Sequence, residues 1–512
     1  MESRRLTMQQ NSKGRPQGRN APPRADAMVE ALRGLGYTTA TALADLVDNS
    51  ISAGASQVEI GFNWYGVDSW ISIADDGRGM NDAELFSAMR LGDRNPLDER
   101  RSSDLGRFGL GLKTASFSQA RRLTVLSIKD GQSSCLRWDL DVLASDPDGE
   151  WHLLDGPESS SEPRLVTHTA QTSGTVVLWE QLDRIVTEGF TSRHFLELID
   201  DVERHLAMIF HRYLDGSGPG IELRLNGKAV RPWDPFLSSN PATWRSPESS
   251  VGEGGLRITS QAFVLPHKDR LNDKAYAEAG GIEGWSSQQG FYIYRGRRLL
   301  VAGSWLGLGR GRSWSKDEAH RLARIRLDLP NDLDAQWKID IRKSSAHPPA
   351  ALRDQLYRLA EDARDRARKV FLHRAHSNSS LGRRDEVVPV WQSRETVTGR
   401  RYRVDRTHAA VKELLDDAAY GTKVEAMLRV LEETIPVQRI WLEAAESGEH
   451  AKGGFTGEPD DSVREVLNVI YRSLVEKKGM SPSMAKRQLL RTEPFDLHSE
   501  LVKNLPDNIS KD

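Results

Sequence analysis

Three short motifs between residues 41 and 114 constrain this 512-residue chain more than any other feature of its sequence. The first, residues 41–56, is TALADLVDNSISAGAS; the second, residues 73–80, is IADDGRGM; the third, residues 104–114, is DLGRFGLGLKT. Glycine-rich loops occur for many reasons, so each motif alone is weak support for a ligand site. Their occurrence together, in this order and at this spacing, indicates one shared site.

The first motif predicts an amphipathic helix that ends near Gly54. Its apolar stripe, at helical spacing, consists of Leu43, Leu46, Val47 and Ile51. Asp45 and Asn49 are four residues apart, so they share another face of this helix. On an isolated helix such a face would simply be solvated. In a pocket, the Asn49 amide oxygen would suit a magnesium ion, and the Asp45 carboxylate would orient a water for attack on a phosphoryl group.

The second motif predicts a strand over residues 70–74 that runs into a tight turn. At the strand end, the Asp75 carboxylate could accept a hydrogen bond from an exocyclic amine, and the turn glycines would let a flat ring approach the backbone. The alternative is an ordinary Asp-Gly turn. In the third motif, three glycines precede an apolar segment that contains Lys113. That arrangement suits a loop and helix N-terminus that bind phosphates through backbone N–H groups, with a ligand-free surface loop as the alternative.

These residues resemble the GHKL ATPases, the superfamily of DNA gyrase B, the MutL mismatch-repair proteins, the cytosolic heat-shock chaperone and the sensor histidine kinases. The likeness is greatest to MORC-type and related bacterial ATPases, whose third motif is similar to Gly-Arg-Phe-Gly-x-Gly-x-Lys. The resemblance implies a Bergerat-type α/β sandwich with a mixed, mostly antiparallel sheet. It further implies an α+β transducer domain after the sandwich, with ATP and Mg2+ as cofactors.

The resemblance also implies roles for particular residues. Asn49 would bind the magnesium ion, and Asp75 would contact adenine with Gly77, Gly79 and Met80 beside it. The residues expected to wrap the phosphates are Gly106, Arg107, Phe108, Gly109, Leu110, Gly111 and Lys113. A fourth element, SGTVVLWE over residues 173–180, is similar to the strand that closes the adenine pocket, with Thr175 as its hydroxyl. Residues 89–104 would form a lid over the nucleotide.

One departure from the family concerns the general base. The hydrolytic members usually place a glutamate four residues before the asparagine, whereas this chain has Asp45. Aspartate is shorter by one carbon–carbon bond, about 1.5 Å, and a shift of that size in a positioning group can lower a rate. We therefore expect slow hydrolysis, or hydrolysis that needs closure by a second subunit. The alternative is a nucleotide-sensing module or scaffold with little or no hydrolysis.

The chain divides into five predicted segments. They are a disordered basic arm (1–25), an ATP-binding domain (26–216), a transducer-like α+β domain (217–375), a polar linker (376–386) and a mostly helical C-terminal domain (387–512). Strands of the first domain are expected at 57–64, 70–74, 123–128, 134–140, 165–169 and 175–179, and strands of the second at 221–230, 291–294 and 323–329. Because few residues separate the strands, most pairings should be antiparallel.

The second domain contains a candidate lysine and a basic segment. In the resembling families a transducer lysine reaches the terminal phosphate, and Lys343 is the first candidate here, with Lys338 second. Between residues 295 and 326 the charge balance turns basic, with Trp305 and Trp314 interleaved. A basic loop with aromatics suits a nucleic-acid backbone, and the predicted contacts are Arg295, Arg297, Arg298, Arg310 and Arg312. The alternative is a solvated face with counter-charges elsewhere in the fold.

Composition limits the partners and the compartment. The net charge is −2, so any basic surface must be local. A single cysteine, Cys135, excludes an internal disulfide framework and fits a reducing cytosol. No apolar run reaches the length of a membrane span, and the N-terminus lacks a signal-peptide core. We expect a cytoplasmic protein.

The predicted function is an ATP- and Mg2+-dependent conformational clamp or switch. The predicted partners are a second copy of the chain in an ATP-dependent homodimer, DNA, and other proteins that bind the C-terminal helical region. A role in DNA maintenance or phage defence follows from family analogy alone. A protein kinase is disfavoured because no phosphoacceptor domain precedes Asp26.

Overall fold

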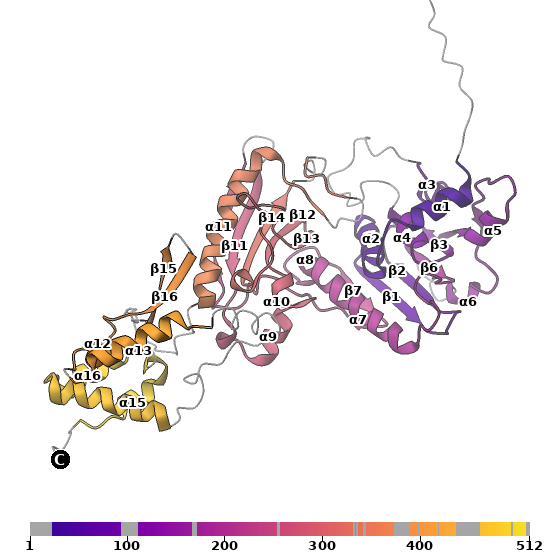
Figure 1. Cartoon of the computed structure of the whole chain (residues 1–512). Helices are drawn as coiled ribbons and strands as arrows, with labels where there is room; N and C mark the ends of the chain where they lie inside the picture. Colours follow the sequence, from indigo (N-terminus) through magenta and orange to yellow (C-terminus); the bar gives the residue numbers. More distant parts are fainter. Residues whose placement is uncertain are drawn as a thin grey trace, which may run out of the picture. The chain divides into compact units, whose positions relative to one another are not determined.

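The computed structural model describes residues 23–93, 111–165, 172–252, 257–330, 333, 336–340, 345–372, 389–396, 399–417, 419–436, 461–492 and 495–507 (Figure 1). The chain divides into two compact units, residues 1–372 and 373–512. Several predicted features lie outside the described residues: Gly106 to Leu110 of the third motif, most of the lid, Lys343, and the linker at 376–386.

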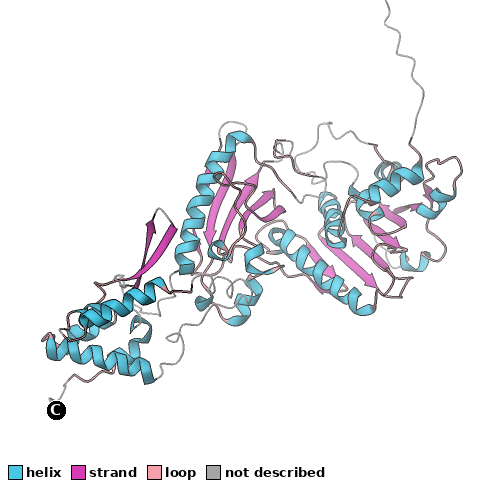
Figure 2. Ribbon diagram, in the orientation of Figure 1, coloured by secondary structure: helices cyan, strands magenta, loops and turns pink. Residues whose placement is uncertain are grey.

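An eight-stranded sheet organises the N-terminal part of the first unit, in the order β5-β4-β3-β6-β2-β1-β7-β8. Figure 2 draws the strands in magenta and the helices in cyan. The strands of this sheet are β1 (Gln57–Asn63), β2 (Trp70–Asp75), β3 (Arg122–Lys129), β4 (Gln132–Asp139), β5 (Leu154–Asp155), β6 (Gly174–Glu180), β7 (Glu222–Leu225) and β8 (Lys228–Ala229). The β1–β7 pair is parallel and the other pairs are antiparallel. The predicted mixed, mostly antiparallel sheet is therefore confirmed.

Helices accompany this sheet. They are α1 (Ala25–Arg33), α2 (Thr39–Ser52), α3 (Asp82–Met89), α4 (Gly111–Phe117), α5 (Leu140–Ser145), α6 (Glu162–Leu165), α7 (Ser192–Ile209) and α8 (His211–Leu214). The central helix, α2, contacts α4 and α7. It begins after Thr38, whose hydroxyl accepts a hydrogen bond from the Thr41 N–H in a capping box. Its apolar stripe is buried at Leu43, Leu46 and Val47, as the spacing predicts.

Two predictions about this domain are corrected. Leu165 is the last residue of α6 and does not begin a strand; residues 166–169 lie outside the described part of the chain. The sequence predicts a strand at 221–230 in the second domain, but β7 pairs with β1 and extends the first sheet. Leu223 and Leu225 are buried against the core of that sheet, so burial rather than chain order decides where this strand belongs.

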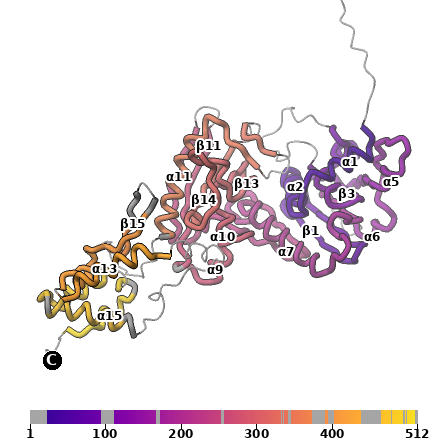
Figure 3. The backbone as a smooth tube through the Cα atoms, in the orientation of Figure 1, coloured from indigo at the N-terminus to yellow at the C-terminus, as the bar shows by residue number. Residues whose placement is uncertain are grey.

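A second sheet of six strands follows, in the order β10-β11-β14-β12-β13 with β9 paired to β11. Its strands are β9 (Trp244–Arg245), β10 (Ser249–Val251), β11 (Ile258–Val264), β12 (Gly290–Arg295), β13 (Arg298–Ser304) and β14 (Ala323–Leu329). The accompanying helices are α9 (Asp273–Ala279), α10 (Gly284–Ser287) and α11 (Ala350–Leu372). Figure 3 follows the chain from the first sheet through the second to α11, which contacts β11 and β14.

The second unit is mostly helical, as predicted. Its helices are α12 (Ala409–Leu415), α13 (Gly421–Glu433), α15 (Asp461–Arg472), a π-helical turn η6 (Ser473–Lys477), α16 (Pro482–Leu489) and α17 (Ser499–Lys503). A hairpin of β15 (Trp391–Thr396) and β16 (Gly399–Val404) was not predicted, because its polar, arginine-rich sequence lacks apolar alternation. In the described parts of both units, no helix is both long enough and apolar enough to cross a membrane.

Candidate functional site

The α2 helix carries the first two candidate residues on neighbouring turns. Asp45 is buried, and its Oδ2 accepts a hydrogen bond from the Tyr37 hydroxyl at 3.0 Å. Asn49, one turn later, is exposed, and its side chain makes no hydrogen bond to any other described residue. The shared helix face therefore runs from the protein interior to the surface, with a carboxylate at the inner end and a carboxamide at the outer end.

Asp48 lies on a different face of α2 and has a structural partner. Its Oδ1 is 3.2 Å from Nε of Arg298 on β13, and both side chains are almost fully buried. This ion pair joins the helix that carries Asn49 to the second sheet. Because Asp48 is already neutralised there, it is not available as an alternative base to Asp45.

The Asp75 carboxylate lies at the end of β2 and is buried. Its Oδ2 accepts a hydrogen bond from the Ser50 hydroxyl at 2.8 Å, and its Oδ1 accepts one from the Gly77 N–H at 2.9 Å. Burial raises the pKa of Asp75, against the opposing effect of these two hydrogen bonds. The site thus holds a desolvated carboxylate that would gain from a further hydrogen-bond donor.

The glycines after Asp75 are required by the protein's own packing. Gly79 has a φ of +64°, and a Cβ there would lie 1.7 Å from the carbonyl oxygen of Ile128 on β3. A Cβ at Gly77 would lie 2.9 Å from Asp75 Oδ1 and from the Ala53 Cβ. The turn is therefore packed directly on β3 and on the end of α2, and it holds the Asp75 carboxylate in place.

Two hydroxyls lie beside Asp75 in the sheet. Thr175 on β6 is the register partner of Asp75, and its Oγ1 is 2.9 Å from Oγ of Ser127 on β3. The Ser127 hydroxyl also accepts a hydrogen bond from the Met80 N–H at 2.9 Å. Sequence reasoning identified Thr175 and Met80 but missed Ser127, Ser50 and Tyr37. The only signal for Ser127 was a polar residue inside an apolar strand.

The described part of the third motif begins at α4. Gly111 lies beside Asp45, since a Cβ at Gly111 would be 3.8 Å from Asp45 Oδ2. Lys113 is buried, and its ammonium donates to the carbonyl oxygens of Ala88 (2.8 Å) and Arg90 (2.9 Å). In this structure the ammonium therefore caps the C-terminal end of α3. A phosphate contact by Lys113 stays a prediction.

The segment that was expected to supply a lysine is described in part. Lys338 is exposed and has a φ of +47°, next to the buried Trp337. Asp340 is close enough to Tyr37 for its negative charge to contribute to a raised Tyr37 pKa, after the larger effects of burial and of Asp45. This segment of the second domain therefore approaches the Asp45 end of the site.

The predicted nucleic-acid contacts separate into buried and exposed residues. Arg295 and Arg298 are buried, and this overturns their place on an exposed basic loop. Arg297 is half-buried and donates to the carbonyl oxygens of Pro219 and Arg212. Arg310 and Arg312 are exposed, and the Arg310 guanidinium lies 5.2 Å from the centre of the Tyr357 ring. The exposure of Arg310 and Arg312 permits a contact with nucleic acid, and this contact stays a prediction.

The comparisons with known proteins agree with this geometry. Residues 37–175 match the family described as histidine kinase-, DNA gyrase B- and HSP90-like ATPase. The matched region contains Asp45, Asn49, Asp75 and Thr175. Residues 37–175 form a GHKL-type ATPase domain.

The chain is also 34% identical over 91 residues to ATPase morc-1 of Caenorhabditis elegans. That match covers 18% of this chain and 10% of the relative, so the chain spans about a tenth of the relative's length.

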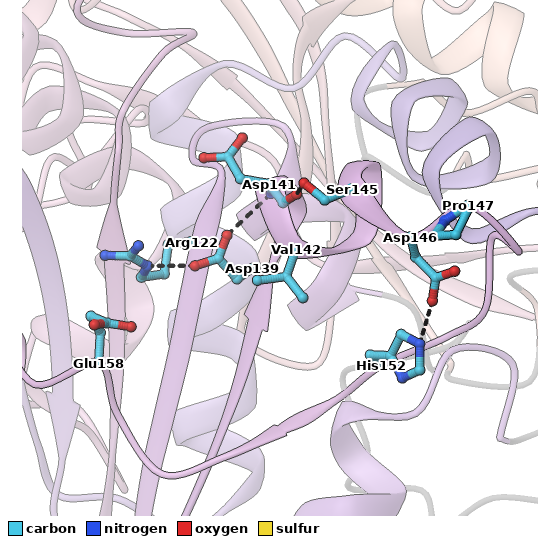
Figure 4. A pocket seen from close by; sticks show the side chains of 9 residues that line it. All are labelled: Arg122, Asp139, Asp141, Val142, Ser145, Asp146, Pro147, His152 and Glu158. Carbon is cyan, nitrogen blue, oxygen red and sulfur yellow. Dashed lines mark hydrogen bonds and ion pairs between the residues drawn. The ribbon is translucent and has the colours of Figure 1, made fainter.

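A separate hollow lies in the ATPase domain and is lined by none of the predicted site residues. It has a volume of about 660 Å³. Figure 4 shows the side chains that line it. Arg122 pairs with Asp139 at 2.9 Å, and His152 contacts Asp146. The lining residues are Arg122, Asp139, Asp141, Val142, Ser145, Asp146, Pro147, His152 and Glu158. Most of its charges are thus acidic, unlike a site for phosphates.

Proposed function

We propose that the ATPase domain binds ATP with Mg2+ and hydrolyses it slowly, so that the chain acts as a nucleotide-dependent clamp or switch. The observation that carries this proposal is the environment of Asp75. Its buried carboxylate is held by the Ser50 hydroxyl and the Gly77 N–H, beside the hydroxyl of Thr175. The exocyclic amine of adenine would donate a hydrogen bond to this desolvated carboxylate and so stabilise it.

The residues present also suit a magnesium ion. Mg2+ takes oxygen ligands and is usually bound through one or two protein groups together with water and substrate phosphates. The exposed Asn49 carboxamide can supply one such oxygen. Within the described ranges, no group of three or more His, Cys, Asp or Glu side chains could hold a metal ion by itself. When bound, the ion would offset the negative charge of the phosphates.

Asp45 is the proposed general base. It lies one turn before Asn49, so its carboxylate would orient a water near a phosphate held at that end of α2. The second candidate function is a nucleotide sensor without useful turnover. It is favoured by the shorter reach of aspartate, which places the carboxylate about 1.5 Å further back than a glutamate would.

The switch itself would involve pairing of two copies. GHKL ATPases commonly dimerise, and a lysine at 343 or 338 would enter the site from the second domain. DNA is the proposed partner of the paired form, through the exposed Arg310 and Arg312. ATP can only shift pairing by its difference in affinity for the two states. Solution size with and without a non-hydrolysable ATP analogue, then with duplex DNA, tests this part.

The experiment that tests nucleotide binding compares two Asp→Asn variants. Asp75→Asn is expected to weaken ATP binding about 10-fold or more in calorimetry, since it removes a charged hydrogen-bond acceptor. Asp68→Asn, at an exposed position, is the matched control. Asn49→Ala is expected to abolish the magnesium-dependent part of binding. Unchanged ATP affinity in Asp75→Asn would contradict the proposal.

Hydrolysis is tested separately by phosphate release from Asp45→Asn. This variant is expected to retain ATP and to lose turnover. Turnover that survives would remove Asp45 as the base, whereas binding without turnover in the unmodified protein would favour the sensor function.

A further inference from the structure

Tyr37 directly precedes the N-cap residue of α2 and reaches across the first turns of that helix to Asp45. Its ring is buried, with 8% of the residue exposed. Its hydroxyl is 3.0 Å from Asp45 Oδ2. No motif in the sequence pointed to this residue, because it stands outside the apolar stripe and outside the Asp/Asn face of the helix.

The Tyr37 hydroxyl is a permanent donor to the carboxylate. Burial and the negative charge of Asp45 both raise the pKa of Tyr37, so the phenol keeps its proton at physiological pH. A neutral phenol beside a carboxylate must donate, and such charge-assisted hydrogen bonds are stronger than neutral ones. This hydrogen bond to Oδ2 therefore holds the Asp45 side chain in one rotamer.

Tyr37 is in turn fixed by α4. The side chain of Thr114 on α4 hydrogen-bonds the Tyr37 hydroxyl. The main chain is held as well, because the Gln119 amide donates to the Tyr37 carbonyl at 3.4 Å, and Gln119 accepts from the Thr39 hydroxyl at 2.7 Å. Gly111, the first residue of α4, lies beside the same Asp45 oxygen. The Asp45 carboxylate thus takes its position from α4 as well as from its own helix.

We infer that Tyr37 is the positioning residue for the general base Asp45. This inference rests on the proposed hydrolysis. An aspartate at this position has a shorter reach than a glutamate, so its productive orientation tolerates less movement. By holding Oδ2, Tyr37 keeps the carboxylate in one orientation without contacting the nucleotide itself. Its removal should therefore lower turnover and leave nucleotide affinity unchanged.

The test is Tyr37→Phe, which keeps the buried ring and removes only the hydroxyl. The expected result is a kcat for ATP hydrolysis reduced about 10- to 100-fold, with the Kd of a non-hydrolysable ATP analogue unchanged. Tyr65→Phe, at a tyrosine that is 67% exposed in the same domain, is the matched control and should hydrolyse ATP at the normal rate. Thr114→Val, which removes the other partner of the hydroxyl, should lower kcat in the same direction by a smaller factor.

A double-mutant cycle separates positioning from a merely structural role. In an Asp45→Asn background, Tyr37→Phe should lower the residual rate no further, because the group that Tyr37 positions is already gone. Equal loss in both backgrounds, or a parallel loss of analogue affinity, would overturn the inference.

Normal turnover in Tyr37→Phe would overturn the inference and leave Asp45 and the proposed function intact. Absence of hydrolysis by the unmodified protein, with ATP bound, would overturn the proposed hydrolysis and this inference together.

Discussion

The region around α2 and β2 buries carboxylates, whereas the second sheet and its loops bury guanidinium groups. The buried carboxylates are those of Asp45, Asp48 and Asp75. The buried arginines of the second sheet and its loops include Arg295, Arg298, Arg321 and Arg324. The two sets meet at the ion pair of Asp48 with Arg298.

Asp48 and Asp75 are both buried carboxylates, but only Asp48 has a cationic partner among the described residues. Asp48 faces a buried cation, which compensates for its desolvation. Asp75 is held by a hydroxyl and an N–H, and no cation pairs with it among the residues that the structure describes. Burial without a counter-ion raises the pKa of Asp75 and disfavours its charged form, and the proposed hydrogen bond from adenine would offset that cost.

The largest predicted effect is the loss of stability when the ion pair of Asp48 with Arg298 is broken. Arg298→Met leaves Asp48 buried without its counter-ion and should lower the free energy of unfolding by about 3–5 kcal/mol. Arg312→Met, at an exposed arginine, is the control and should change it by less than about 0.5 kcal/mol. Urea unfolding of the purified protein measures both. A loss at Arg298 no larger than at Arg312 would mean that the pair does not join the two sheets.

The next effect concerns the acid sensitivity of the junction between the sheets. Burial lowers the pKa of His211 to about 4, and its Nε2 is 2.8 Å from the Tyr294 hydroxyl. Between the unfolded pKa near 6.5 and the folded pKa, the unfolded state binds more protons, so stability falls as the pH drops through this window. The expected loss from this group between pH 7 and pH 5 is about 2 kcal/mol. His211→Gln should flatten the pH dependence of unfolding; an unchanged slope would contradict the assignment.

A smaller effect of opposite sign is predicted for Asp75. Because its folded pKa is raised, the native state binds more protons than the unfolded state just above pH 3.8, so stability falls as the pH rises through that window. Asp75→Asn removes this cost and should keep or raise the melting temperature at pH 7, while it weakens ATP binding about 10-fold or more. Thermal unfolding of the variant and of the unmodified protein at pH 4 and pH 7 measures the difference in melting temperature. A melting temperature that falls by several degrees at pH 7 would assign Asp75 a structural role like that of Asp48.

The smallest effect on stability is predicted for the exposed arginines. Arg310→Ala with Arg312→Ala should change the free energy of unfolding by less than about 0.5 kcal/mol. If the proposed DNA contact exists, the same pair should reduce the slope of log affinity against log salt by about one per arginine. An unchanged slope would exclude the contact.

Local patterns predicted most of the fold and part of the site. The apolar stripe of α2, the strand that ends at Asp75 and the late Gly-Thr strand each follow from residues close together in sequence. The contacts that local patterns did not predict depend on distant partners. Lys113 lies in a loop-like motif but caps α3, and Arg298 lies in a basic run but pairs with Asp48. Neither partner can be read from the surrounding sequence.

The position of β7 has a consequence for synthesis on the ribosome. This strand covers the edge of β1, which lies more than 150 residues earlier in the chain. Until residue 225 has left the exit tunnel, the nascent domain presents an uncovered strand edge that neighbouring polypeptides can join. A fragment ended at residue 216 keeps every predicted ATP contact in the sheet and still exposes that edge. Recombinant pieces of this domain should therefore extend to Ala229 to remain monomeric during refolding.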